Sequence, residues 1–175
     1  MMESKSELIA SLIRDVPDFP KPGVVFKDIT PLLASPDGFA AAVEELVALA
    51  PGPIDIVVGM EARGFIFAAP VALKLGAGFV PVRKAGKLPG DVHEVSYSLE
   101  YGEEVLELQQ DAVQPGEQVL VVDDEPGMRN FLVKTLRPRP RPATALQILN
   151  GAPVPLPPAS LRNASDLSCI AVAIY

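Results

Sequence analysis

The sequence contains no tryptophan, one cysteine and one histidine in 175 residues. The single cysteine, Cys169, excludes a disulfide within the chain, and Cys169 and His93 together do not supply the four ligands of a structural zinc site. No apolar run approaches the ~20 residues that a membrane-spanning helix needs. The first seven residues also lack the basic and then apolar pattern of a secretory signal. We therefore expect a cytoplasmic, reduced setting and no membrane partner.

Positive charge is scarce in most of the chain. Residues 1–125 hold 9 basic and 21 acidic side chains, whereas residues 126–175 hold 6 basic and 1 acidic side chain together with 8 of the 19 prolines. The net charge of −7 argues against a nucleic-acid partner. The shift near residue 125 is typical of a domain boundary, a tail or a change in the origin of the sequence.

Three continuous apolar runs predict buried strands of a parallel sheet: Ile54–Gly59, Phe79–Arg83 and Val119–Val122. A helix is predicted over Gly64–Leu75, between the first two strands. Strand, helix and strand at this spacing form a βαβ unit, so the sequence predicts an α/β fold.

The flanking segments are less regular. A helix is predicted over Glu3–Arg14, and another from about Gly38 to Ala50, capped by Ser35 or Asp37. The prolines between Val16 and Gly23 predict an extended segment without a regular ladder. Residues 84–101 are predicted to form a long loop with a strand or hairpin at residues 95–99. In the last 50 residues we expect a helix at 128–136, a polyproline-like stretch at 137–142 and a strand at 143–149, while the apolar end at 167–175 receives no role.

Four polar groups follow predicted strands or lie in the long loop. An arginine at the start of a helix suits a phosphate, three cations suit an anion, a glutamate between aromatics in a loop suits a general acid, and paired acids at a strand end suit a sugar diol or Mg²⁺. Each group also has a plain structural interpretation, as a glycine turn, a solvated loop, an ordinary hairpin or surface acids. The groups are Glu61-Ala62-Arg63, Arg83-Lys84-Ala85-Gly86-Lys87, Tyr97–Gly102 around Glu100 and Tyr101, and Asp123-Asp124.

Together with an N-terminal segment, these groups resemble a type I phosphoribosyltransferase, and within that class the adenine phosphoribosyltransferase family. The resemblance covers about residues 7–124, or about 70% of the chain. It is carried by five stretches in order: Arg14–Leu33, Glu61–Phe65, Val82–Pro89, Tyr97–Gly102 and Val119–Asp124.

The resemblance implies a twisted, mostly parallel sheet with flanking helices and a small N-terminal hood at residues 1–33. It implies one domain over residues 1–124, to which residues 125–175 belong if they fold. The implied reaction converts adenine and 5-phosphoribosyl-1-pyrophosphate (PRPP) to AMP and pyrophosphate in purine salvage. Mg²⁺ is the implied cofactor, held mainly through PRPP and water rather than by direct protein ligation, and a homodimer is the implied assembly.

The resemblance also implies roles for single residues. Glu100 is the implied general acid near the adenine N7, and Tyr101 closes the site beside it. Adenine contacts fall on Val24, Val25, Phe26 and Lys27, the last of which stands where many relatives have arginine. Glu61, Ala62 and Arg63 match the pyrophosphate loop, in which the family often has a cis peptide. Arg83, Lys84 and Lys87 match cations that balance pyrophosphate and Mg²⁺, and Asp123 and Asp124 match the pair that holds the ribose hydroxyls.

The sequence departs from the family directly after Asp124. The family continues with an Ala-Thr-Gly-Gly-Thr type of loop, whose N–H groups and hydroxyls bind the 5-phosphate. This chain has Glu125-Pro126-Gly127-Met128-Arg129-Asn130 instead. Pro126 removes an N–H donor, and Glu125 repels phosphate. The alternative function is therefore a catalytically impaired or inactive variant that binds adenine or nucleotide, or that only dimerises.

Three hypotheses explain the last 50 residues. They are a genuine divergence, an alternative reading of the gene by frameshift, retained intron or splicing, or a fusion; we favour the alternative reading. Val119–Leu132 also resembles the start of a response-regulator receiver. Too few residues follow for the rest of a receiver, however, and Asp166 lacks the surroundings of a phospho-acceptor. We also expect the loss of the usual final strands to leave the sheet edge open or poorly packed.

Overall fold

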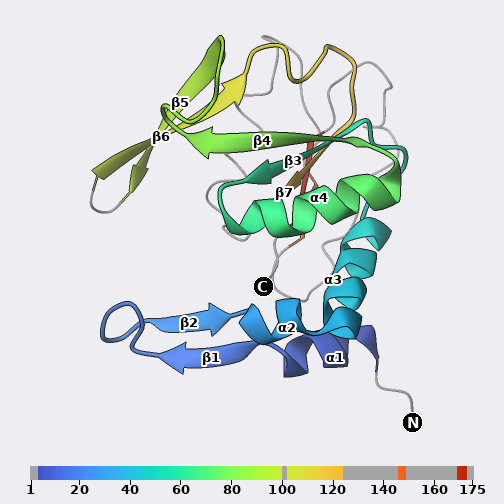
Figure 1. The fold of residues 1–175 in the computed structure, drawn as a ribbon, viewed down its shortest axis with the longest axis vertical. Helices are drawn as coiled ribbons and strands as arrows, with labels where there is room; N and C mark the ends of the chain where they lie inside the picture. The colour runs from blue at the N-terminus through green and yellow to red at the C-terminus, as the bar shows by residue number, and fades with distance from the viewer. Residues whose placement is uncertain (1–3, 100–101, 124–145, 149–168, 173–175) are drawn as a thin grey trace. The chain divides into compact units, whose positions relative to one another are not determined.

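The computed structural model describes residues 4–99, 102–123, 146–148 and 169–172 (Figure 1). The chain divides into two compact units, residues 1–49 and residues 50–175. Each unit is described by itself. None of the helices within these described residues is long and apolar enough to cross a membrane.

The first unit contains three helices and a two-stranded sheet. Its elements are α1 (Lys5–Ser11), β1 (Arg14–Pro17), β2 (Val25–Asp28), α2 (Thr30–Ala34) and α3 (Pro36–Ala48). A capping box starts α1, in which the Glu7 N–H donates to the Ser4 hydroxyl and the Ser4 N–H to the Glu7 carboxylate. The predicted helix over residues 3–14 is too long, because Arg14 already belongs to β1. Of the two candidate caps for α3, Ser35 accepts the Gly38 N–H at 3.1 Å.

The strands β1 and β2 form an antiparallel pair that the sequence did not predict. Val16 is paired with Phe26, and Pro17 with Val25. The expectation that the prolines exclude a ladder is therefore wrong for the first two residues of Val16–Gly23. Both strands of a two-stranded sheet are edge strands, and an edge strand tolerates a proline that donates no hydrogen bond.

The second unit is built on a seven-stranded sheet in the order β5-β6-β4-β3-β7-β9-β8. Its strands are β3 (Ile56–Met60), β4 (Gly78–Lys84), β5 (Val92–Leu99), β6 (Gly102–Gln109), β7 (Val119–Val122), β8 (Leu146–Ile148) and β9 (Cys169–Val172). The five strands from β4 to β8 in this order are parallel, and β6 is antiparallel to both β4 and β5. The predicted α/β fold with a mostly parallel sheet is confirmed.

The helix α4 (Arg63–Leu75) connects β3 to β4 and packs on β3, β4 and β7 (Figure 1). Two glycines permit this close packing. A Cβ atom at Gly59 would lie 2.8 Å from the Ala68 Cβ, and a Cβ atom at Gly64 would lie 2.7 Å from the Val122 carbonyl oxygen. The predicted βαβ unit is thus present, and the helix lies close to the carboxyl ends of β3 and β7.

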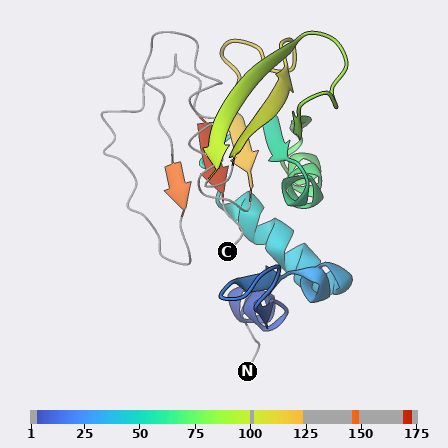
Figure 2. The same cartoon turned by 90° about the vertical axis from the view of Figure 1, so that its left-hand side faces the viewer.

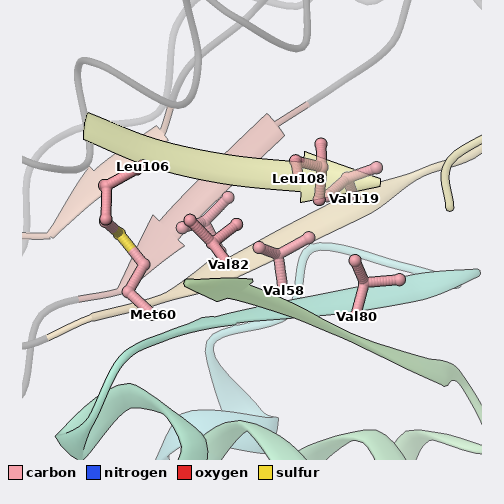
Figure 3. Close-up of a cluster of buried hydrophobic side chains, with 8 residues drawn as sticks. Val58, Met60, Val80, Val82, Leu106, Leu108 and Val119 are labelled. Carbon is pink, nitrogen blue, oxygen red and sulfur yellow. The ribbon is translucent and has the colours of Figure 1, made fainter. Parts of the chain in front are cut away.

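The core on one side of this sheet is aliphatic. Figure 3 shows its side chains, which come from β3, β4, β6 and β7, gathered between the strands. Burying such side chains stabilises a fold by roughly 1.5–3 kcal/mol each. The cluster therefore holds the strands that end at the candidate site; it consists of Val58, Met60, Val80, Val82, Leu106, Leu108, Val119 and Val121.

Part of the segment that was predicted as a long loop is the strand β5, which pairs with β6. They pair antiparallel over eight residue pairs, from Val92 with Gln109 to Leu99 with Gly102, and Figure 2 shows them as a curved pair. The prediction of a loop is wrong at residue 84, which ends β4, and at residues 92–94, whereas the strand predicted at residues 95–99 is confirmed within β5. The first three residues of β5, Val92-His93-Glu94, do not alternate as a half-buried strand does, and alternation begins only at Val95.

Two short strands from the last 50 residues extend the sheet beyond β7. Cys169–Val172 pairs in parallel with Val119–Val122, and Leu146–Ile148 pairs in parallel with residues 170–172. The expectation of an open sheet edge beside β7 is therefore wrong, and the strand predicted at residues 143–149 is confirmed as β8. The helix predicted at 128–136 and the polyproline-like stretch at 137–142 lie outside the described residues.

Candidate active site

The carboxyl ends of three neighbouring parallel strands define the candidate site. β3 lies between β4 and β7, and Glu61, Lys84 and Asp123 stand at or directly after the three strand ends. The chain leaves β3 towards β4 on one side, while β7 lies on the other side. In open α/β sheets such a switch in strand order is where ligands bind.

Glu61 joins the end of β3 to the loop after β4. Its Oε2 accepts the Arg83 Nε–H at 3.4 Å and the backbone N–H of Lys84 at 3.2 Å, and its Oε1 accepts from the Lys87 Nζ. We call residues 83–87 the cation loop. The sequence nominated Glu61 in one group and Arg83, Lys84 and Lys87 in another, and the structure joins the two groups, with Lys84 contacting Glu61 through its backbone N–H.

The charge state of this cluster follows from its hydrogen bonds. The Lys87 ammonium, the Lys84 N–H and the Arg83 guanidinium together lower the pKa of Glu61 to about 2. Glu61 is therefore ionised at neutral pH. One carboxylate against two contacting cations leaves this cluster positive, and such a cluster suits an anion.

The turn between β3 and α4 lies beside this cluster. The Glu61–Ala62 peptide bond is cis, Ala62 is the N-cap of α4 without a side-chain cap, and Arg63 begins the helix. The N–H groups at the start of a helix attract anions. Because Gly64 lies against the Val122 carbonyl, this turn is also next to the end of β7.

Asp123 follows β7 directly and is only 6% exposed. Of the two acids predicted at the end of this strand, the structure describes Asp123 there. The other acid, Asp124, and the loop residues Glu100 and Tyr101 lie outside the described residues.

Val25, Phe26 and Lys27 lie on β2 of the first unit. Val25 is 56% exposed, and the rings of Phe26 and Phe19 pack edge to face with centroids 5.1 Å apart. Lys27 forms an ion pair with Asp15 on the neighbouring strand. β2 thus carries an exposed apolar side chain, Val25, on one face and the half-buried Phe26 of the aromatic pair on the other.

One residue that contacts the cation loop was not nominated from the sequence. The Glu107 Oε1 on β6 accepts the Gly86 N–H at 2.8 Å. The available signal was a single acid between two leucines, Leu106-Glu107-Leu108, in a stretch that alternates. Such a pattern usually marks a solvent-facing acid, but Glu107 is only 6% exposed.

Metal ligands of the usual kind do not gather in the described part of the chain. Among residues 4–99, 102–123, 146–148 and 169–172, no three His, Cys, Asp or Glu side chains form a group that could hold a metal ion. The Glu61 carboxylate is also already bound by three nitrogen donors. This donor set does not fit an all-protein site for a hard divalent cation.

The comparisons with known proteins agree on one kind of enzyme. The chain is 69% identical over 123 residues to the adenine phosphoribosyltransferase of Cutibacterium acnes, covering 70% of each chain. It is 63% identical over 119 residues to that of Acidothermus cellulolyticus, covering 67% of each chain. No family model matches the chain.

Solved structures of the same kind share the fold. The adenine phosphoribosyltransferase of Thermoanaerobacter pseudethanolicus superposes with a TM-score of 0.65 at 48% identity, over 69% of this chain and 70% of that one. The Saccharomyces cerevisiae enzyme, complexed with adenine and an imino-altritol bisphosphate, superposes with a TM-score of 0.65 at 39% identity, over 70% of this chain and 73% of that one.

Proposed function

Because the chain belongs to the adenine phosphoribosyltransferase family, we propose that it transfers the 5-phosphoribosyl group of PRPP to adenine, giving AMP and pyrophosphate. It is then a pentosyl transferase of purine salvage. The relatives' names support this reaction, and the yeast structure holds adenine itself. Nothing in the comparisons favours the alternative of an inactive variant.

The observation that carries the proposal is the positive cluster at the strand ends. The Arg83 guanidinium, the Lys87 ammonium and the backbone N–H of Lys84 converge on Glu61, and the two cations outweigh the one carboxylate that they contact. When the bond from C1 to pyrophosphate breaks, negative charge grows on the leaving group. Cations fixed at that position stabilise the transition state more than the ground state.

The remaining nominated residues receive roles from the reaction. Asp123 and Asp124 bind the ribose hydroxyls, and the N–H groups of the turn at Glu61, Ala62 and Arg63 bind pyrophosphate oxygens. Val25, Phe26 and Lys27 hold the adenine ring. The exposed side chain of Val25 and the edge-to-face pair of Phe19 and Phe26 support that role.

Glu100 and Tyr101 act at the adenine end of the reaction. Adenine loses a ring proton as its N9 bonds to C1, so in AMP synthesis Glu100 near N7 accepts that proton, and in the reverse direction it is the general acid; Tyr101 helps to close the site. Closure excludes water, which would otherwise hydrolyse PRPP. The chain's aromatic and acidic side chains in this loop are of the kinds that these two tasks need.

We also propose Mg²⁺ as the cofactor, held mainly through the phosphate oxygens of PRPP and through water. Mg²⁺ in sites of this kind is usually bound through one or two carboxylates together with substrate phosphates. When bound, the ion neutralises negative charge on the pyrophosphate. A homodimer and a cytoplasmic location complete the proposal.

The decisive experiment is an assay of the purified chain with adenine, PRPP and Mg²⁺. We expect AMP and pyrophosphate in equal amounts, and we expect PRPP to raise the melting temperature of the chain. Guanine in place of adenine is the matched control. AMP formation at no more than the background rate, together with an unchanged melting temperature in PRPP, would overturn the proposal in favour of the inactive variant.

A further inference from the structure

Glu107 on β6 is a buried acid that has no role in the proposed function. Glu107 is 6% exposed, and its neighbours Leu106 and Leu108 point into the aliphatic cluster of Figure 3. Because side chains alternate along a strand, Glu107 points to the opposite face of the sheet. The Oε2 of Glu107 has no hydrogen-bond partner among the described residues. An unpartnered buried acceptor costs free energy that an apolar side chain would avoid, so packing alone does not account for this glutamate.

The other oxygen of Glu107 holds the cation loop. Its Oε1 accepts the Gly86 N–H at 2.8 Å, and the preceding Ala85 N–H donates to the Val105 carbonyl at 3.1 Å. Gly86 has a φ of +78°, a backbone conformation that glycine adopts without strain. β6 thus binds two consecutive N–H groups of the loop, between the two lysines that the proposed function uses.

Glu107 also lies opposite the arginine of the same loop. Arg83 on β4 is the register partner of Glu107 on β6, and side chains of directly paired residues share one face of the sheet. On the other side, Glu61 contacts Arg83 and Lys87. The cation loop is therefore held by an acid from each side, Glu61 from the end of β3 and Glu107 from β6.

We propose that Glu107 is a positioning residue for the cation loop, a role that rests on the proposed function. Its buried carboxyl group fixes Gly86 and so sets where Lys84 and Lys87 meet the pyrophosphate part of PRPP. Glu61 alone does not provide this constraint, because it binds the loop at Lys84 and Lys87 but not at the glycine between them. The acceptor of this part-buried hydrogen bond is itself buried, so water competes for it less than for an exposed carboxylate.

The test compares Glu107→Ala and Glu107→Gln with Glu94→Ala and Glu94→Gln. Glu94 on β5 is the direct cross-strand neighbour of Glu107 and is exposed. For Glu107→Ala we expect the KM for PRPP and the Kd for pyrophosphate to rise about tenfold or more, since small misplacements of binding groups have large effects. The KM for adenine should stay unchanged, and the Gly86 amide should exchange its hydrogen faster. Glu107→Gln keeps an oxygen that can accept from Gly86 and should recover part of the affinity, while the Glu94 variants should match the wild type.

Unchanged pyrophosphate affinity and unchanged Gly86 exchange in a folded Glu107→Ala variant would overturn the proposal. If that variant does not fold, Glu107→Leu decides, because leucine fills similar space without an acceptor: an unaltered ratio of the two KM values together with unaltered Gly86 exchange overturns it. Pyrophosphate binding and amide exchange do not depend on turnover. A wild-type chain that binds pyrophosphate but makes no AMP would overturn the proposed function alone, and a wild-type chain that does not bind pyrophosphate would overturn both.

Discussion

The carboxylate of Glu61 links two loops that lie more than twenty residues apart in the sequence. Its partner Arg83 lies near the end of the next strand, β4, and its partner Lys87 lies on the loop that follows. The sequence nominated all three residues, because charged side chains directly after buried strands gather at one edge of a parallel sheet. Their contacts depend on the register of β3 and β4, in which Met60 is level with Val82. Apolar runs locate a strand but do not determine its register to one residue, so the contacts could not be predicted.

The low pKa of Glu61 predicts a pH-dependent contribution to stability. Its pKa falls from 4.5 to about 2 on folding, so its contribution is complete above about pH 4.5 and is lost as the pH falls towards 2. We expect Glu61→Gln to lower the free energy of unfolding at pH 7 by about 1–2 kcal/mol, allowing for solvent screening of the partly exposed cations. The difference from the wild type should shrink at pH 3.

Urea unfolding at pH 7, 4.5 and 3 checks this expectation. Asp111→Asn is the control, because it removes one carboxylate from an exposed position of the same unit. A deficit of Glu61→Gln that is equally large at all three pH values would show that lost packing, rather than lost charge, is responsible.

Because Lys87 is positively charged, we predict that its removal weakens PRPP binding but not adenine binding. Its ammonium contacts Glu61, and its side chain is 43% exposed, so it can also reach a bound anion. We expect Lys87→Ala to raise the KM for PRPP about tenfold or more, because a hydrogen bond to a charged group contributes about 1.5–3 kcal/mol. The KM for adenine should change by less than about twofold.

Steady-state kinetics with each substrate varied in turn measure both constants. Lys74→Ala is the matched control, since it removes the same charge from the last turn of α4, at the end of the helix away from Arg63. Equal increases in both KM values would mean that Lys87 supports the fold of the site rather than the pyrophosphate.

The sequence predicted the buried strands of the sheet more clearly than the exposed ones. β3 and β7 are continuous apolar runs, β4 is apolar up to Val82, and β7 is buried along its whole length. β5 was missed in part because its first three residues do not alternate and gain their place through the ladder with β6. β1 was missed because Pro17 argued against a strand, and only the two-stranded context removes that objection.

The contact between α4 and β7 predicts a strict requirement for glycine at position 64. A Cβ atom there would lie 2.7 Å from the Val122 carbonyl oxygen, so the helix start or the end of β7 must move. We expect Gly64→Ala to destabilise the chain by roughly 1–3 kcal/mol, the usual cost of overpacking. It should also weaken PRPP binding, because Glu61 and Asp123 flank this contact.

Thermal unfolding with and without PRPP separates the two effects. Gly52→Ala is the control, since a Cβ atom at Gly52 meets nothing within 4 Å. A melting temperature of Gly64→Ala equal to that of the control would show that the helix accommodates the methyl group without cost.

The sheet includes strands from a part of the chain that the family resemblance does not cover. The relatives match about 70% of the sequence, yet β8 and β9 from the last 50 residues complete the sheet beside β7. The sequence could not predict this pairing, because short apolar segments far along the chain do not specify which strand they join. The chain therefore forms the sheet although its sequence lacks the phosphate loop that is typical of the family.

The segment after Asp124 yields a prediction about the full chain. We expect replacement of Glu125–Phe131, by a segment of equal length that ends in Ala-Thr-Gly-Gly-Thr, to lower the KM for PRPP about tenfold or more. Pro126 has no N–H to donate and Glu125 repels phosphate, whereas glycine N–H groups and threonine hydroxyls bind it. The KM for adenine should not change. A control segment of equal length, made of alanine and serine without glycine, should give a smaller gain. If neither replacement alters the KM for PRPP, this chain binds the 5-phosphate group with residues other than those that follow its paired acids.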